Sequence, residues 1–338
     1  MTELVRHSCM ATGLALLLGL ALDLAIGDPS FSLHPVRLLG GLAARIEALT
    51  RRMFGKRQPA LAGTLCWLFV AGTSALCALA LSSFAWKAGY LAGIAMDACI
   101  LWASIAPTDL SRHALRVQKA LEHSAGEEHL TATRQAVSMM VGRDVSRAGE
   151  HDIARACVES VAESCVDGIG APIFWAALAG PWAAFAYRAI NTMDSMFGHK
   201  NERYLRFGAV AARADDAANM LPARLGGLVI AICAPLARGY VGKAFSCLRK
   251  QRLDSESPNA GHPESAFAGA LDLRLGGPVA YPEGIAYRPW LNPVGHEPQA
   301  KDITRSVRLM WAQTVGCMLL FMALRYGLSS VVLLFASA

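Results

Sequence analysis

The chain has 338 residues, of which 54% are hydrophobic and only 17% are charged, and its formal net charge is +6 at pH 7. Soluble domains usually carry about 25% charged residues, and the deficit here is concentrated in long apolar segments. This pattern excludes an ordinary soluble domain and makes a lipid bilayer the first expected partner. The basic residues are spread through loops and form no stripe, which argues against nucleic acid and suits anionic lipid or an anionic substrate.

Six apolar segments set the expected architecture. Three are long enough to cross a hydrocarbon core of roughly 30 Å as helices, at about Leu61–Ala85, Tyr90–Ala106 and Met310–Phe335. Three are shorter or interrupted, at Met10–Ile26, Ile169–Tyr187 and Leu221–Ala237. We therefore predict an all-α fold, a polytopic α-helical integral membrane protein with short or re-entrant helices and with cytosolic helical and irregular loops.

The segments Ile169–Tyr187 and Leu221–Ala237 leave two structures open, because each contains two prolines. Proline removes a backbone donor, so these segments are either broken or re-entrant helices that line a cavity, or plain tilted helices. If both crossed the membrane, residues 188–220 would face outward, away from cytosolic ATP. We therefore expect both segments to be re-entrant or to stop short of the far side.

The connecting segments indicate orientation. Gly27–Ala60 carries six basic residues against two acidic ones, which favours a cytosolic location. Residues 108–167 show helical spacing of apolar residues and predict a cytosolic amphipathic helical insertion. Residues 253–300 are rich in proline and glycine and predict a long irregular cytosolic loop. We expect the whole chain, 1–338, to form a single membrane-embedded domain.

Three acidic residues, Glu159, Glu163 and Asp167, follow one another at intervals of four. On a helix they share one face, where like charges repel unless a cation or a basic ligand lies between them. Mg²⁺ takes one or two carboxylates together with phosphate oxygens and water, so the triplet is a candidate metal site. The alternative is a solvated helix face.

A second polar stretch directly follows an apolar segment. Arg188, Asn191 and Asp194 are spaced at i, i+3 and i+6 and so share a helix face, and Asn201 and Arg203 come after them. Ionisable groups at a membrane edge are costly to place there, which favours a functional role.

A third polar stretch has the same pattern. Arg213, Asp216 and Asn219 are spaced at i, i+3 and i+6, Asp215 and Asn219 at i and i+4, and Arg224 follows at the start of an apolar run. The alternative to a site is an ion pair between Arg213 and Asp216 that anchors a helix end.

Two further polar groups lie beside turn-forming residues. "GDPSFSLHPVRLLG" contains Asp28, His34 and Arg37, and "SPNAGHPESAFAGAL" contains Asn259 and Glu264. A single histidine such as His34 is more often structural than catalytic. The chain contains no GxxxxGK[ST], HExxH or GxSxG motif and no GxGxxG motif after a strand. Any nucleotide must therefore bind in a different cradle.

Taken in order, these stretches resemble the CobD/CbiB family of cobalamin biosynthesis, the membrane-bound adenosylcobinamide-phosphate synthases. The resemblance runs from about Asp23 to Gly284 and rests on "DLAIGDP", "HPVRLLG", "GRDVS", "ESVAESCVDGIGAPIFWA", "AINTMDSMFGHKNERYLRFG", "DDAANMLPARL", "SPNAGHPESAFAGAL" and "RLGGPVAYPEG". Several ordered motifs over this length are far more specific than any one of them.

The resemblance implies an ATP-dependent acid–amine ligase that forms a C–N bond. It would join adenosylcobyric acid to (R)-1-aminopropan-2-ol phosphate, to the free amino alcohol or to an ethanolamine derivative, with ATP as co-substrate and Mg²⁺ as cofactor. The expected location is the cell inner membrane, multi-pass, with the active site facing the cytoplasm. A homo-oligomer and a complex with other corrin-pathway enzymes are both open. The rival is a non-catalytic corrinoid-binding membrane protein or transporter subunit, because broken helices and membrane-edge ions suit transporters too.

Under this resemblance the polar residues receive roles. The carboxylate must be activated, most simply as an acyl phosphate, and metal ions and arginines would offset the charge of the transferring phosphoryl group. The metal candidates are Glu159, Glu163, Asp167, Asp194 and Asp216. The catalytic candidates are Asp194, Glu163, His34 and Glu264, and either of the last two would take the amine proton. The substrate-binding candidates are Asp28, Arg37, Arg188, Asn191, Asn201, Arg203, Arg213, Asn219, Arg224 and Asn259.

Overall fold

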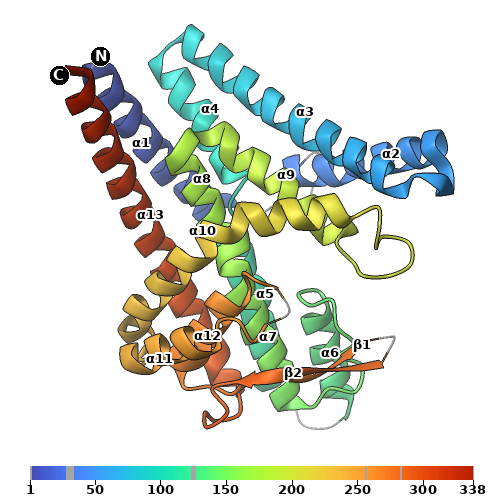
Figure 1. The fold of residues 1–338 in the computed structure, drawn as a ribbon. Helices are drawn as coiled ribbons and strands as arrows, with labels where there is room; N and C mark the ends of the chain where they lie inside the picture. Colours follow the sequence, from blue (N-terminus) through green and yellow to red (C-terminus); the bar gives the residue numbers. More distant parts are fainter. Residues whose placement is uncertain (1, 28–33, 123–126, 256, 282–283, 338) are drawn as a thin grey trace. The chain divides into compact units, whose positions relative to one another are not determined.

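The computed structural model describes residues 2–27, 34–122, 127–255, 257–281 and 284–337 (Figure 1). In these residues the chain is mostly helical, with one two-stranded sheet. Six helical segments are long and apolar enough to cross a membrane, at Cys9–Ile26, Pro59–Ala88, Tyr90–Glu122, Glu150–Ala179, Ala209–Ala237 and Ala300–Ser330. Each overlaps one of the six predicted apolar segments, which confirms the polytopic α-helical membrane fold.

The chain divides into two compact units. Unit 1 comprises Met1–Ala106, Ala171–Asn219 and Met318–Ala338, and unit 2 comprises Pro107–Gly170 and Met220–Cys317. Helices α10 (Ala209–Cys233) and α13 (Ala300–Ser337) each contribute residues to both units.

Unit 1 is helical. Its further elements are α1 (Thr2–Ile26), α2 (Pro35–Phe54), the 3₁₀ turn η1 (Gly55–Arg57), α3 (Pro59–Ala88), α4 (Tyr90–Trp102), α8 (Ala171–Ala179) and α9 (Pro181–Phe197). Helix α3 packs against α2, α4 and α9, and α1 packs against α4. The core formed by α2, α3 and α9 buries the apolar side chains of Cys66, Val70, Met193, Phe197 and Phe207.

Unit 2 combines helices with the sheet. Its further elements are α5 (Pro107–Glu122), α6 (Glu127–Ser138), α7 (Glu150–Cys165), the π-helical turn η2 (Val166–Gly170), the 3₁₀ turn η3 (Ala234–Ala237), α11 (Val241–Gln251), α12 (Gly261–Leu271), β1 (Leu275–Tyr281) and β2 (Gly284–Leu291). Helix α7 packs against α5 and α12, and α11 packs against α12. Strands β1 and β2 pair antiparallel, with an irregularity between Gly276 and Pro278.

The local structure of residues 253–300 corrects one prediction. The sequence predicted an irregular loop there, whereas the structure has α12 and the β1–β2 hairpin. The apolar stretch "SAFAGAL" is buried as one helix, and its alanines and glycine are small enough to pack closely on all sides. Proline and glycine content therefore misled the prediction, because here these residues flank regular elements and do not replace them.

The apolar segment Ile169–Tyr187 is broken, which selects one of the two alternatives left open for it. Helix α8 ends at Ala179 and α9 begins at Pro181, and the two helices pack against each other. Gly180 between them has φ +101°, a backbone conformation that side chains disfavour. Pro181 fits the first turn of α9, where a missing N–H costs nothing.

In the segment Leu221–Ala237, α10 ends at Cys233 and the 3₁₀ turn η3 follows, but α10 continues through Pro222. Proline at this position leaves the carbonyl of Ala218, four residues earlier, without its helical donor. The indole Nε1–H of Trp175 on α8 donates to that carbonyl at 3.2 Å. A side chain from a neighbouring helix therefore replaces the missing bond, as helices in a membrane require.

Gly63 on α3 permits a close backbone approach. A Cβ atom at this position would lie 1.8 Å from the carbonyl oxygen of Phe207. The end of the loop 198–208, which connects α9 to α10, therefore rests directly on the backbone of α3.

Candidate functional site

A buried polar network joins α9 and α10 in unit 1. Asp215 accepts hydrogen bonds from Asn191 Nδ2 at 3.3 Å and from Asn219 Nδ2 at 3.0 Å, and Tyr187 donates its hydroxyl to Asn219 Oδ1 at 2.8 Å. Asp215 and Asn219 are 8% and 1% exposed. Asp194 lies close enough to Asp215 for their charges to interact. We call these five residues the Asp215 network.

Two carboxylates in a buried network repel each other unless a proton or a cation lies between them. Mg²⁺ is commonly held by one or two carboxylates, with substrate phosphate and water completing its shell. Asp194 and Asp215 fit that requirement. No group of three or more His, Cys, Asp or Glu side chains is arranged to hold a metal ion in the described part of the chain. Substrate oxygens would therefore have to supply the remaining ligands.

The other candidates on these helices lie outside the buried core of the network. Arg188 on α9 and Asp216 on α10 are half-buried, and Arg213 is exposed. Asp216 interacts electrostatically with Lys200. Asp215, which lies at i, i+4 from Asn219, was not among the metal candidates predicted from the sequence.

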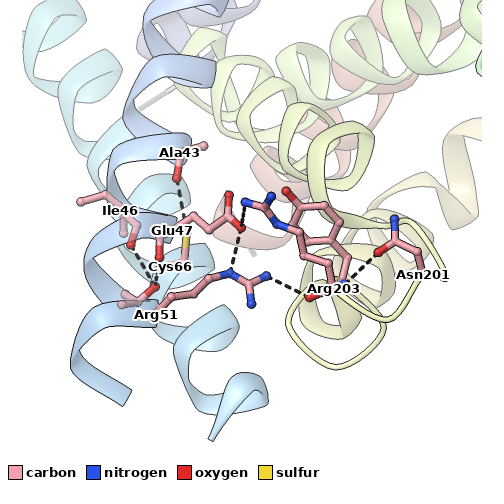
Figure 2. A network of polar contacts seen from close by, with 9 residues as sticks. Ala43, Ile46, Glu47, Arg51, Cys66, Asn201 and Arg203 are labelled. Atoms are coloured by element: carbon pink, nitrogen blue, oxygen red, sulfur yellow. Dashed lines mark hydrogen bonds and ion pairs between the residues drawn. The ribbon is translucent and has the colours of Figure 1, made fainter. Parts of the chain in front are cut away.

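The loop 198–208 carries two further candidates, and both have partners within unit 1 (Figure 2). Arg203 Nη2 donates to Glu47 Oε1 at 3.1 Å, and Arg51 donates to the same oxygen at 2.8 Å. Arg51 also donates to the carbonyl of Arg203 at 3.0 Å. Asn201 accepts the backbone N–H of Tyr204 at 3.0 Å. Glu47 and Arg51 on α2 therefore fix the loop, a function that the sequence analysis did not assign to them.

The candidates near the start of α2 are placed as follows. His34 is buried at the N-terminus of the helix, with its ring edge-on to Trp102 at 5.5 Å between centroids. Arg37 is exposed one turn later. Asp28 lies outside the described residues.

Unit 2 has its own cluster of charged groups. Glu159 on α7 accepts an ion-paired hydrogen bond from Arg143 at Oε2, and at Oε1 it accepts the N–H of Gly276 on β1 at 2.6 Å. Burial, followed by the charges of Glu163 and Glu159, raises the pKa of Glu264 on α12 well above its usual range. Arg288 and Arg143 oppose that shift. We call these five side chains, from Arg143, Glu159, Glu163, Glu264 and Arg288, the Glu264 cluster.

The Glu264 cluster has the chemistry of a proton-transfer site. A carboxyl group whose pKa is raised keeps its proton to higher pH and becomes a stronger base once ionised. Glu264, Glu159 and Glu163 were candidates predicted from the sequence, whereas Arg143 and Arg288 were not. The motif "GRDVS" contains Arg143 and could have identified it as a candidate. Asp167, the third member of the acidic triplet, lies half-buried in η2, where the π-helical turn changes the angular step between residues.

The two remaining candidates meet at the start of the apolar half of α10. Arg224 Nη1 donates to Asn259 Oδ1 at 3.3 Å, and Asn259 is buried. Burial and the neighbouring Arg224 and Arg252 lower the pKa of His262 to about 4. His262 is therefore neutral at pH 7, and the positive charge here belongs to the arginines.

Comparison with known proteins covers almost the whole chain. A sequence model of the family described as CobD/Cbib protein matches residues 16–310. The cobalamin biosynthesis protein CobD of Rhodobacter capsulatus is 38% identical over 298 residues, which are 87% of this chain and 91% of the relative. The cobalamin biosynthesis protein CbiB of Salmonella paratyphi B is 37% identical over 321 residues, which are 95% of this chain and 99% of the relative. The cobalamin biosynthesis protein CobD of Clostridium perfringens is 34% identical over 295 residues, which are 87% of this chain and 92% of the relative. No solved structure matches the chain.

Proposed function

Since this chain belongs to the CobD/CbiB family, we propose that it acts in cobalamin biosynthesis as a ligase that forms an amide bond. It would join the free propionate of adenosylcobyric acid to the amine of (R)-1-aminopropan-2-ol phosphate or a related amino alcohol. The product would be adenosylcobinamide phosphate or its relative. The observation that carries this proposal is the Glu264 cluster, because its arrangement of carboxylates and arginines suits acid activation and proton transfer.

The reaction proceeds in two steps. A propionate oxygen attacks the γ-phosphorus of ATP, so that an acyl phosphate forms and ADP leaves. The amine then attacks the acyl carbon, phosphate leaves, and the amine proton passes to a base. Bound Mg²⁺ would supply positive charge that offsets the phosphoryl oxygens.

Each unit contains candidate residues for these steps. Asp194 and Asp215 would hold the metal ion, while Asn191 and Asn219 fix the orientation of the Asp215 carboxylate. Glu264 is the candidate proton acceptor, because its raised pKa brings a carboxylate closer to the operating range of a general base. Glu159 is engaged by Arg143 and Gly276, which suits a residue that sets the local charge better than one that binds metal.

The proposal also gives the protein a location. We place it in the inner membrane, with the loop 198–208 facing the cytoplasm, where ATP is available. Asn201 is exposed, so a single cysteine at this position in an otherwise cysteine-free chain tests the location. Membrane-impermeant thiol reagents should label Asn201→Cys in inverted vesicles and leave it unlabelled in intact cells. Labelling in intact cells would contradict the cytoplasmic location.

The function itself is tested with the purified chain in detergent. Adenosylcobyric acid, amino alcohol phosphate, ATP and Mg²⁺ are added, and the amide is measured by mass spectrometry. Product that requires both ATP and Mg²⁺ supports the ligase. Tight binding of adenosylcobyric acid without product would favour the rival, a non-catalytic corrinoid-binding or transporter subunit.

A further inference from the structure

Unit 2 contains a cavity that the roles assigned above do not use. It has a volume of about 710 Å³ and is lined by the loop 143–148, the first turns of α7 and the β1–β2 hairpin. Small-molecule sites usually measure roughly 300–1,000 Å³, so the cavity has the size of a site for a nucleotide-sized ligand.

One wall of the cavity is basic. Arg143, Arg147 and Arg155 line it, against Asp144 and Asp152. Arg155 donates Nη2–H to Asp152 at 2.7 Å, but its buried Nε–H has no acceptor among the described residues. Arg155 lines the cavity and is only 7% exposed, so a phosphate in the cavity would meet its guanidinium in a poorly solvated environment. The planar guanidinium fork matches phosphate oxygens better than an ammonium group does.

In the loop 143–148 the backbone N–H groups of three residues donate within the protein. Asp144 N–H donates to Ala280 on β1 at 2.9 Å, Ser146 N–H to the side chain of Asp144 at 2.9 Å, and Ala148 N–H to Val145 at 3.1 Å. We therefore expect arginine side chains to make most of the phosphate contacts in this cavity. This differs from a P-loop, whose backbone N–H groups cradle the phosphates.

The apolar part of the cavity lining comes from the hairpin. Pro278, Val279 and Ile285 line it, which suits the nucleoside portion of a ligand. The guanidinium carbons of Arg155 and Arg274 lie 5.1 Å and 4.5 Å from the centroid of the Trp290 ring. Trp290 therefore orients Arg155 by a cation–π contact and is not the surface on which a base would stack.

We propose that this cavity binds a nucleoside triphosphate, with its phosphates on the three arginines and its nucleoside on the hairpin wall. The inference rests on the proposed function, since it gives a place to the ATP of that reaction. Arg143 joins the cavity to the Glu264 cluster, because the same side chain lines the cavity and binds Glu159.

Titration calorimetry of the full chain with ATP and Mg²⁺ tests the proposal. Arg147→Ala and Arg155→Gln should each weaken ATP binding about tenfold, because each removes a charged hydrogen bond to phosphate. Arg249→Ala on α11, an exposed arginine that does not line the cavity, is the matched control and should bind ATP like the wild type. Inorganic triphosphate should compete with ATP. Unchanged affinity in both cavity variants would overturn the proposal, as would displacement by amino alcohol phosphate without any binding of ATP.

A second measurement keeps the test decisive if Arg155→Gln fails to fold. Photolabelling of the wild type with an azido-ATP should modify peptides from residues 142–156 and 275–291, and labelling confined to other peptides would overturn the proposal. Amide formation is measured in parallel. ATP bound in the cavity without amide would contradict the proposed function alone. Amide formed with unchanged ATP affinity in Arg147→Ala and Arg155→Gln would contradict the cavity assignment alone.

Discussion

Arg51, and not the candidate ligand Arg203, should stabilise the loop 198–208. Arg51 makes the shorter contact to Glu47 and donates to the backbone of Arg203 (Figure 2). Its guanidinium carbon also lies 4.1 Å from the centroid of the Phe207 ring. The helical ion pair contributes about 0.3–0.5 kcal/mol, the cation–π contact about 0.5–1 kcal/mol and the hydrogen bond about 1 kcal/mol. Arg51→Ala should therefore cost about 2 kcal/mol in total.

Arg203 should behave differently because its side chain is 64% exposed. Solvent screens its pair with Glu47, so Arg203→Ala should leave the unfolding temperature close to that of the wild type. If Arg203 moves from Glu47 to a phosphate when substrate binds, the same variant should lose at least about tenfold in kcat/KM. Arg206→Ala, an exposed arginine of the same loop, is the matched control for both measurements.

Thermal unfolding in detergent, followed for all three variants alongside amide formation, separates these effects. The expected order is a Tm lower by several degrees for Arg51→Ala and a Tm near wild type for Arg203→Ala and Arg206→Ala. Equal Tm values for Arg51→Ala and Arg206→Ala would show that Arg51 does not stabilise the loop 198–208. Full activity in Arg203→Ala would remove Arg203 from substrate binding.

Four other outcomes are expected from the Asp215 network and the Glu264 cluster. Because the folded pKa of Glu264 lies above its unfolded value, ionisation of Glu264 lowers the free energy of unfolding as the pH rises from the unfolded pKa towards the folded pKa. Glu264→Gln should therefore gain Tm over the wild type as the pH increases, yet lose amide formation, and a pH-independent Tm difference would count against the shift. Asp194→Asn should abolish product formation in a chain that remains inserted and folded, and wild-type turnover would remove Asp194 from the mechanism. Asp215→Asn should weaken activation by Mg²⁺ about 10- to 100-fold, whereas activation of Asp216→Asn should stay near wild type. Equal Mg²⁺ activation curves for the two variants would contradict a metal-binding role for Asp215 alone. Chelation with EDTA should stop the reaction and Mg²⁺ should restore it, whereas turnover in EDTA would argue against a metal requirement.

The membrane helices followed from the sequence because twenty consecutive apolar residues have few other stable arrangements. Their interruptions were harder to predict. Ile169–Tyr187 and Leu221–Ala237 carry the same number of prolines, and in each the helix runs past the first proline and ends before the second. Neighbours far along the chain contribute to this, since Trp175 satisfies the carbonyl that Pro222 leaves open. A helical pattern contains no information about such a donor.

The sequence predicted which types of residue form the candidate site better than it predicted which side chains contact each other. Helical spacing placed both Asp215 and Asp216 beside Asn219, and spacing alone did not decide which aspartate faces inward. That choice is set by α9, where Asn191 and Tyr187 meet the face carrying Asp215. Ion pairs across long sequence separations, such as Glu47 with Arg203, have no local signal at all.

The close approach at Gly63 bears on which substitutions this protein tolerates. Any side chain there would displace the backbone of Phe207, which no rotamer change relieves. Exposed residues in the middle of the loop, such as Leu205 and Arg206, meet no such limit. In a saturation library selected for membrane expression, position 63 should accept glycine alone, while positions 205 and 206 should vary freely. The loop can therefore diversify its chemistry at the tip while the point where it rests on α3 stays fixed.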